Sequence, residues 1–419
     1  MFFKLPCWLL ALSGAGAIAS ASAASLGFDD ALTRALAETP ALAASALKID
    51  AARQNAIPAG ALPDPQLTLG VSNVPIEGAD RFSLDSDPMT MRMVGVMQDV
   101  PNAARRRARA SAANGRTGVA EAELQVLRQN VLQQTAQAWI RRHAVEAQLQ
   151  RIAALYDENR LFDAAVRARL AGGGGMASDV VLPREEAAAI AEREDQLAAQ
   201  RAQAVAALRR WVGDAADWPL DGAPPTWPID HASLAHRIEA HPELALYGEQ
   251  ARVLDAEIGD ARAATRPDWR VGLVYQQRAS QFGDMASVEF GFDLPVFASS
   301  RQQPLIAARV AERAALDAEY QAQLRAHRAE LDADLAEYRR LDQALARQQE
   351  VLLPLAQEKV ALTQAAWRGG QGSLADLIAA RRAHIDAELR AIELAGMRDE
   401  MGARLHFTYA QPAETGGQP

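Results

Sequence analysis

Hydrophobic residues along this chain follow two different periods, and the two periods alternate twice. Apolar and polar residues alternate at 65–75 and at 89–99, as on strands with one apolar face. Two similar runs follow at 267–277 and 285–295. Each pair of runs precedes a long stretch rich in Ala, Leu, Gln and Arg, in which apolar residues recur every seven positions. That spacing is typical of helices that supercoil against a neighbour.

The two helical stretches are long, and each is predicted to turn back on itself. No proline occurs between residues 102 and 171, so the first helix could extend for about 105 Å at a rise of ~1.5 Å per residue. Glycine-rich turns interrupt the two stretches at 172–175 and 369–372, and Pro354 is expected to kink the second. The residues that carry the seven-residue spacing are Leu124, Val131, Ala138, Val145, Ile152 and Val166, then Leu324, Leu331, Tyr338, Leu345 and Leu352.

The same order of elements occurs twice, which predicts an internal duplication. Pro63-Asp64 precedes the first β-hairpin, and Pro267-Asp268 begins the second. The predicted fold class is mainly α with a small β part, a β-hairpin plus a long coiled-coil helical hairpin in each repeat. The expected boundaries are repeat 1 at 24–213 with hairpins 65–99 and 102–212, a connector at 214–229, repeat 2 at 230–407 with hairpins 267–295 and 302–405, and a disordered tail at 408–419.

The first 23 residues have the pattern of a secretory signal peptide. Lys4 precedes an apolar run, and Ala21-Ser22-Ala23 offers a cleavage site after Ala23. The only cysteine, Cys7, lies in this segment. Removing Lys4 leaves 43 basic and 53 acidic residues, a formal charge of −10, which does not favour a nucleic-acid partner. No later stretch has the ~20 consecutive apolar residues of a membrane-spanning helix.

Four strands per chain are too few to cross a membrane alone, because the smallest spanning barrels have about eight. Either the strands form a small soluble sheet, or three chains together supply a twelve-stranded barrel, with the long helices below it. In the second case one side of each strand faces lipid. The expected lipid-facing residues are Leu67, Leu69, Val71, Val94, Val96, Val271, Leu273, Tyr275, Val288 and Phe290.

No motif for catalysis, cofactor binding or metal binding emerges from the sequence. The seven histidines are scattered, and no Cys, His and carboxylate spacing indicates zinc. Met89, Met91, Met93 and Met97 could offer soft ligands to Cu(I), but methionine is also an ordinary apolar filler. The run of arginines at 105–109 follows a strand end and is read as a charged collar at the membrane–periplasm boundary.

The order of these motifs resembles the TolC-like outer-membrane factor family. The resemblance covers essentially the whole chain after the signal peptide. Members of this family are trimeric ducts that dock to a periplasmic adaptor and an inner-membrane RND pump. The matching motifs are Thr39-Pro40-Ala41-Leu42, His241-Pro242-Glu243-Leu244, Pro63-Asp64-Pro65, Gln98-Asp99-Val100-Pro101 with the arginines after it, and the segment from Trp367 to Leu377.

The resemblance implies a homotrimer in the cell outer membrane, in contact with lipid there and with its helices in the periplasm. Such a protein is a passive exit duct of a tripartite efflux system and not an enzyme. Within the family, the first hairpin is most similar to the heavy-metal branch, which implies metal cations as cargo. The motifs are Asp64-Pro65-Gln66, Asn73-Val74-Pro75 and the segment from Asp87 to Met93.

The resemblance also assigns roles to the two helical-hairpin tips. It implies that Asp376, and by analogy Asp179, lie at the periplasmic aperture, although an acidic residue in a first helical turn also favours the helix dipole. It implies adaptor contacts at Gly172, Gly175 and Ser178 and at Gly370, Gly372 and Ser373, although any helical hairpin needs glycine in its turn. An arginine that often accompanies the aperture in the family is replaced by Gly372.

Two other functions remain open from the sequence. The chain could be a periplasmic coiled-coil adaptor, although an adaptor usually has one helical hairpin and this chain has two. It could also be a duct for drugs and not for metals. Aromatic residues of the second hairpin fit a membrane interface, namely Trp269, Tyr275, Phe290 and Phe292, whereas the first hairpin offers only Phe82.

Overall fold

The structure is a computed structural model that describes residues 24–409. The expected signal peptide at 1–23 therefore lies outside the described residues. In the first repeat the elements are α1 (Phe28–Glu38), α2 (Pro40–Ala56), β1 (Gln66–Ser72), β2 (Met91–Val100), α3 (Ala103–Ala171) and α4 (Leu182–Val212). In the second they are α5 (His231–Arg237), α6 (Pro242–Ala263), β3 (Asp268–Gln277), β4 (Met285–Asp293), α7 (Gln302–Arg347), α8 (Leu353–Arg368) and α9 (Leu374–Tyr409).

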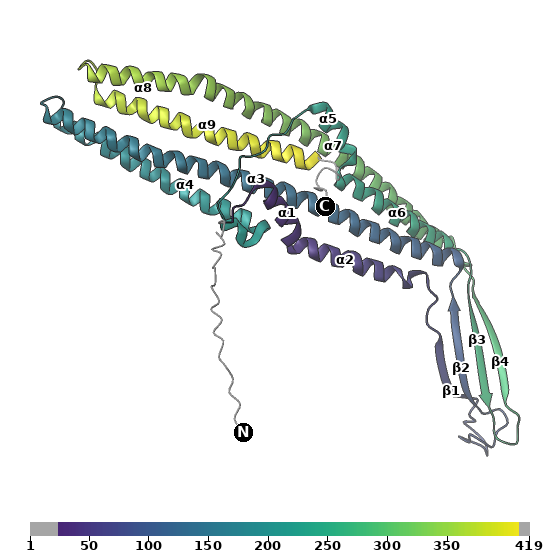
Figure 1. The fold of residues 1–419 in the computed structure, drawn as a ribbon. Helices are drawn as coiled ribbons and strands as arrows, with labels where there is room; N and C mark the ends of the chain where they lie inside the picture. Colours follow the sequence, from purple (N-terminus) through teal and green to yellow (C-terminus); the bar gives the residue numbers. More distant parts are fainter. Residues whose placement is uncertain (1–23, 410–419) are drawn as a thin grey trace, which may run out of the picture.

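The molecule is elongated, with the sheet at one end and the turns of both helical hairpins at the other (Figure 1). The four strands stand away from the helices, and no helix covers either face of the sheet among the described residues (Figure 1). The sheet order is β1-β2-β3-β4, and every neighbouring pair is antiparallel. Pairing of β2 with β3 thus joins the two predicted hairpins into one sheet, which leaves β1 and β4 as its edges.

The seven-residue spacing identifies most of the buried face of the long helices. Val131, Ala138, Val145 and Ile152 are all buried on α3. The core is distributed along the bundle in several clusters, as expected for helices that contact each other over their length. The predicted fold class is confirmed for the single chain.

The spacing fails at one position, Leu352, whose side chain is 47% exposed. A π-helical turn occupies Gln348–Leu352, immediately before Pro354. Because a π-turn holds one residue more than an α-turn, it rotates the following side chains away from the core. The π-turn displaces Leu352 from the buried face.

The end of the chain corrects one boundary. The disordered tail was expected from residue 408, but α9 continues through Thr408 to Tyr409. Tyr409 is 2% exposed, and its hydroxyl donates to the backbone oxygen of His327. Packing of this aromatic ring holds the last turn in helical form. The rest of the expected tail lies outside the described residues.

Across residues 24–409, each helix falls short of the length and apolar character that a membrane crossing requires.

Candidate functional site

One face of the sheet is a continuous apolar surface. The register pairs Leu67 with Val96, Val96 with Leu273 and Leu273 with Val288. Because directly paired residues lie on the same face of a sheet, these four side chains form one row across all four strands. Leu69, Val94 and Tyr275 form a second row, and Val271 and Phe290 belong to a third.

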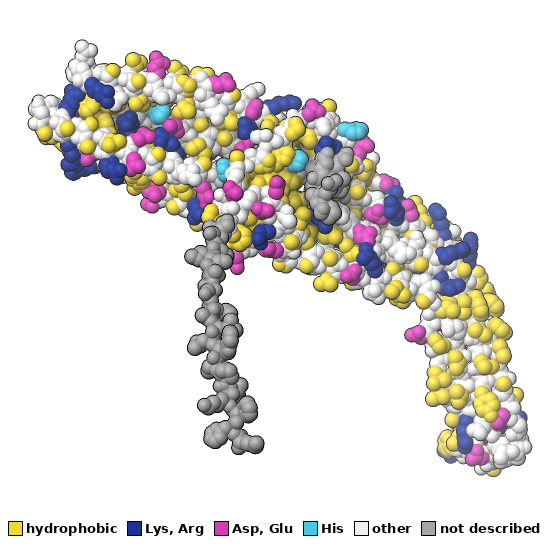
Figure 2. Space-filling view, viewed as in Figure 1, with side chains coloured by type: hydrophobic (Ala, Val, Ile, Leu, Met, Phe, Trp, Pro, Cys, Tyr) yellow, Lys and Arg dark blue, Asp and Glu magenta, His cyan; other side chains and the backbone are white. Residues whose placement is uncertain are grey.

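All ten residues predicted to face lipid therefore share one face. Their side chains are largely exposed, from 47% at Val94 to 68% at Leu69, and Val271 alone is half-buried. Figure 2 shows hydrophobic side chains gathered over the sheet, below a band of basic residues where the sheet meets the helices. An apolar surface of this extent marks a binding or membrane surface in a folded protein.

The opposite face of the sheet carries many polar and small residues, with methionines and Val274 among them. Thr68, Gly95, Val274 and Ser287 form one of its rows. The methionines of β2 lie on this face, in register with Ser72, Gly70 and Gln66 of β1. A side chain at Gly70 would lie 3.5 Å from Cγ of Met93, so Met93 covers the glycine. That packing gives this methionine a structural role on the polar face.

A hydrogen-bonded junction connects the sheet to the first helical hairpin. Asn102 caps α3 by accepting from the backbone N–H of Arg105 at 2.9 Å. The carboxylate of Asp268, the first residue of β3, accepts from the backbone N–H of Asn102 at 2.7 Å and from Arg105 at 2.6 Å. Arg105 and Arg109 both lie 3.4 Å from Asp260. Part of the predicted arginine collar thus holds the second repeat against the first.

At the tip between α3 and α4, backbone geometry accounts for two of the predicted glycines. Gly173 and Gly175 have φ values of +80° and +96°, which L-residues rarely adopt. A 3₁₀ turn at Ala177–Val180 then precedes α4. The side chain of Asp179 accepts from the backbone N–H of Met176 at 2.9 Å. Asp179 therefore caps this turn, and α4 begins only at Leu182.

The tip between α8 and α9 has a similar local structure. Gly370 has a φ of +75°. Ser373 Oγ accepts from the backbone N–H of Asp376 and donates to its carboxylate at 2.6 Å. A Cβ on Gly372 would lie 3.0 Å from Ala366 Cβ, so close packing against α8 explains glycine where the family often has arginine. Asp376 is exposed, whereas Leu377 and Ile378 beside it are buried.

The two tips pack against each other, as Figure 1 also shows. The guanidinium of Arg169 on α3 stacks 4.6 Å from the ring centre of Trp367 and donates to its backbone oxygen. Phe162 and Val166 of α3 and Leu374 of α9 complete an apolar cluster with this tryptophan. The resulting end surface combines both glycine turns with an exposed Asp376.

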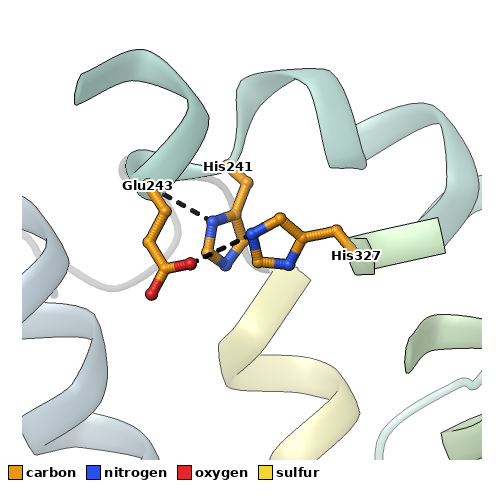
Figure 3. A group of neighbouring side chains, drawn as sticks. All are labelled: His241, Glu243 and His327. Atoms are coloured by element: carbon orange, nitrogen blue, oxygen red, sulfur yellow. Dashed lines mark hydrogen bonds and ion pairs between the residues drawn. The ribbon is translucent and has the colours of Figure 1, made fainter. Parts of the chain in front are cut away.

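A group of two buried histidines and a partly exposed glutamate lies far from both ends of the molecule. His241 caps α6, Glu243 follows it, and His327 projects from α7 (Figure 3). His327 Nε2 lies 3.0 Å from a carboxylate oxygen of Glu243, and the two imidazole rings are 4.2 Å apart between centroids. No local sequence pattern connects these residues, because 86 positions separate His241 from His327. Only the His-x-Glu spacing at 241–243 could have drawn attention to them.

Burial and hydrogen bonding set the charges of His241 and Glu243. Burial, and then the proximity of His327, lower the pKa of His241 to about 4. The hydrogen bond with His327 is the main cause that lowers the pKa of Glu243. His241 is therefore neutral and Glu243 is ionised at neutral pH.

Several solved outer-membrane channels have the same fold as this chain. Solved structures with the same fold include a membrane protein from Pseudomonas aeruginosa, at a TM-score of 0.78 and 18% identity, over 91% of this chain and 93% of that one. VceC, an outer membrane protein of Vibrio cholerae, has a TM-score of 0.74 at 17% identity, over 92% of this chain and 96% of VceC. CusC, described as forming a transmembrane channel, has a TM-score of 0.75 at 18% identity, over 93% of this chain and 92% of CusC.

Residues 31–214 match the family model described as outer membrane efflux protein. No curated protein sequence matches the chain. The first repeat thus matches the family of outer membrane efflux proteins, and the chain as a whole has the fold of solved outer-membrane proteins. This family consists of transport ducts and not of enzymes.

Proposed function

We propose that three copies of this chain form a passive exit duct through the outer membrane, as one component of a tripartite efflux system. The observation that carries the proposal is the sheet, whose apolar face is exposed along all four strands and whose edges, β1 and β4, pair with nothing further within residues 24–409. An open edge in lipid leaves backbone groups without hydrogen bonds. Joining β4 of one copy to β1 of the next satisfies both edges and turns the apolar face toward lipid.

The long helices support the same assembly. They carry large apolar side chains that are 56–73% exposed within residues 24–409, including Leu305 on α7, Leu161 on α3 and Leu355 and Leu362 on α8. Apolar residues exposed at this level along a helical bundle favour contact with another helix. In a trimer, the six hairpins of three copies would enclose the periplasmic part of the duct.

The proposal assigns the hairpin tips to the periplasmic end. The adaptor and the inner-membrane pump would act at this end, with Gly172, Gly175, Ser178, Gly370, Gly372 and Ser373 at the docking surface. Asp376 is exposed beside the buried Ile378, so three copies of Asp376 would give a ring of carboxylates at the aperture. The capping hydrogen bond from Ser373 positions this carboxylate without neutralising it.

Membrane fractionation tests the location and the assembly together. The processed chain should be recovered with the outer membrane, require detergent for extraction, and have three times the mass of one chain by native mass spectrometry. A periplasmic adaptor, the competing function, should be released without detergent. Recovery of a soluble monomer from the periplasm would contradict the duct.

Metal cations are the proposed cargo, and this part rests on the resemblance of the first hairpin to the heavy-metal branch. Deletion of the gene should lower the concentrations of Zn²⁺, Co²⁺ or Cu²⁺ salts that the cells tolerate, with tolerance of hydrophobic drugs unchanged. Complementation with the wild-type gene should restore growth. The reverse pattern, sensitivity to drugs alone, would assign the duct to drug efflux.

A further inference from the structure

His241, Glu243 and His327 bring three metal-ligating side chains together in the helical part of the molecule. One nitrogen of each ring and one carboxylate oxygen lie within 4.8 Å of one another. We propose that these three residues bind a divalent transition-metal ion, with Zn²⁺ as the favoured ion. The proposal goes beyond the duct function and does not depend on what the duct exports.

The geometry is close to that of a three-ligand site. In Figure 3, the His241 ring, the His327 nitrogen that faces Glu243 and the Glu243 carboxylate lie close together. A metal on the His241 nitrogen that accepts from the backbone N–H of Glu243 would replace that hydrogen bond, because a ring nitrogen has one lone pair. With Zn²⁺ bonds of about 2.0–2.1 Å, ligand atoms lie about 3.4 Å apart around a tetrahedral ion. The Glu243 side chain is 43% exposed, so it can rotate to close the remaining distance while the two buried rings stay in place.

The donor set suits the ion. Two imidazoles and one carboxylate, with a fourth position open to water, are a recurrent zinc arrangement, and imidazole also suits copper and nickel. An ion would also compensate the negative charge of Glu243 beside two buried rings.

A second observation separates this group from an ordinary buried ion pair. His327 is 4% exposed, and its Nδ1 has no hydrogen-bond partner within the described part of the chain. Buried polar atoms are usually satisfied, so hydrogen bonding between His327 and Glu243 does not complete the environment of this ring. A metal on Nε2 would make Nδ1 an N–H donor, the form in which a ligating histidine usually bonds a second partner.

The site would join three helices. His241 and Glu243 belong to the start of α6 and His327 to α7, while the hydroxyl of Tyr409 on α9 donates to the backbone oxygen of His327 at 3.3 Å. A bound ion would therefore fix the start of α6 against α7 beside the end of α9. Its role is structural and lies away from both the sheet and the tips.

Metal titration of the purified protein tests the proposal. The full processed chain, extracted in detergent, prepared without a polyhistidine tag and stripped with EDTA, is titrated with Zn²⁺ against a chromophoric chelator. One equivalent per chain is expected, and Co²⁺ in its place should give the visible absorption of a four-coordinate ion. His327→Gln and Glu243→Gln should each weaken Zn²⁺ binding by at least about 100-fold, the upper end of the loss seen for outer partners of a site.

His384→Gln is the matched control. His384 on α9 also lies near a glutamate, 3.9 Å from Glu388. Among the described residues, however, it belongs to no group of three potential metal ligands. This variant should therefore bind Zn²⁺ as the wild type does. Absence of the equivalent in the wild type, or binding unchanged in both site variants, would overturn the proposal. Should His327→Gln fail to fold by circular dichroism, Glu243→Gln and the wild-type Co²⁺ spectrum decide the matter.

Discussion

At the scale of single residues, Asp268 holds the two repeats together where the sheet meets the helices. Its carboxylate accepts from the backbone and side chain of Asn102 and from Arg105, and the Asp268 side chain is 19% exposed. Asp268→Asn should lower the free energy of unfolding by about 1–3 kcal/mol, because it leaves donors of Asn102 and Arg105 without their charged acceptor. Thermal unfolding in detergent measures the change.

The control is Asp293→Asn. Asp293 pairs with Asp268 in the strand register, and its carboxylate lies 2.7 Å from the Arg270 guanidinium. This ion pair is exposed, because the side chains of Arg270 and Asp293 are 44% and 67% exposed. Its loss should cost no more than about 1 kcal/mol. Equal effects of the two variants would show that the junction does not depend on the Asp268 carboxylate.

His241 predicts a second residue-scale effect, a loss of stability in acid. Its pKa is about 4 in the folded chain against the ordinary 6.5, so between these values the unfolded state binds a proton that the folded state does not. The free energy of unfolding should therefore fall as the pH drops from about 6.5 to about 4, by a total on the order of 3 kcal/mol. Glu243, whose pKa is also lowered, acts in the same direction.

Unfolding by denaturant at several pH values, with EDTA present throughout, measures this dependence. His241→Gln removes the titrating group and should flatten the curve between pH 4 and 6.5. A wild-type stability that stays constant or rises through this range would contradict the assigned pKa.

At the scale of elements, two leucines at equivalent seven-residue positions differ in burial. Leu331 is fully buried and Leu352 is 47% exposed. Leu331→Ala should cost about 2–5 kcal/mol, whereas Leu352→Ala should cost no more than about 0.5 kcal/mol, as for a surface position. Thermal unfolding compares the two variants, and similar losses would contradict the change of helical face at the π-turn.

The same pair shows what periodicity can and cannot predict. Hydrophobic spacing identified Val131, Ile152 and Leu331 as buried, because a regular helix turns by the same angle at every residue. It failed at Leu352, because the extra residue of the π-turn changes that angle and the spacing contains no sign of it. The start of α4 at Leu182 cannot be read from the sequence either, since Ser178 and Asp179 suit a short 3₁₀ turn as well as the start of an α-helix.

At the scale of the whole molecule, alternation placed all ten apolar strand residues on one face, because the side-chain period of a strand is two. Pairing of β2 with β3 was beyond the sequence argument, since it joins segments about 170 residues apart. The same is true of His241 and His327. Contacts over such separations depend on how the helices pack, and no local pattern records them.

The central claim is that three copies close through the edges β1 and β4, and cysteine cross-linking tests it most directly. The only native cysteine, Cys7, lies in the expected signal peptide, so Thr68→Cys on β1 with Ser287→Cys on β4 places two thiols on the polar face of the opposite edges. In outer-membrane fractions, a flexible bis-maleimide should give dimers and trimers and nothing larger, while Thr68→Cys alone should stay monomeric. A double variant that stays monomeric, or a ladder continuing beyond the trimer, would contradict the closed trimeric duct.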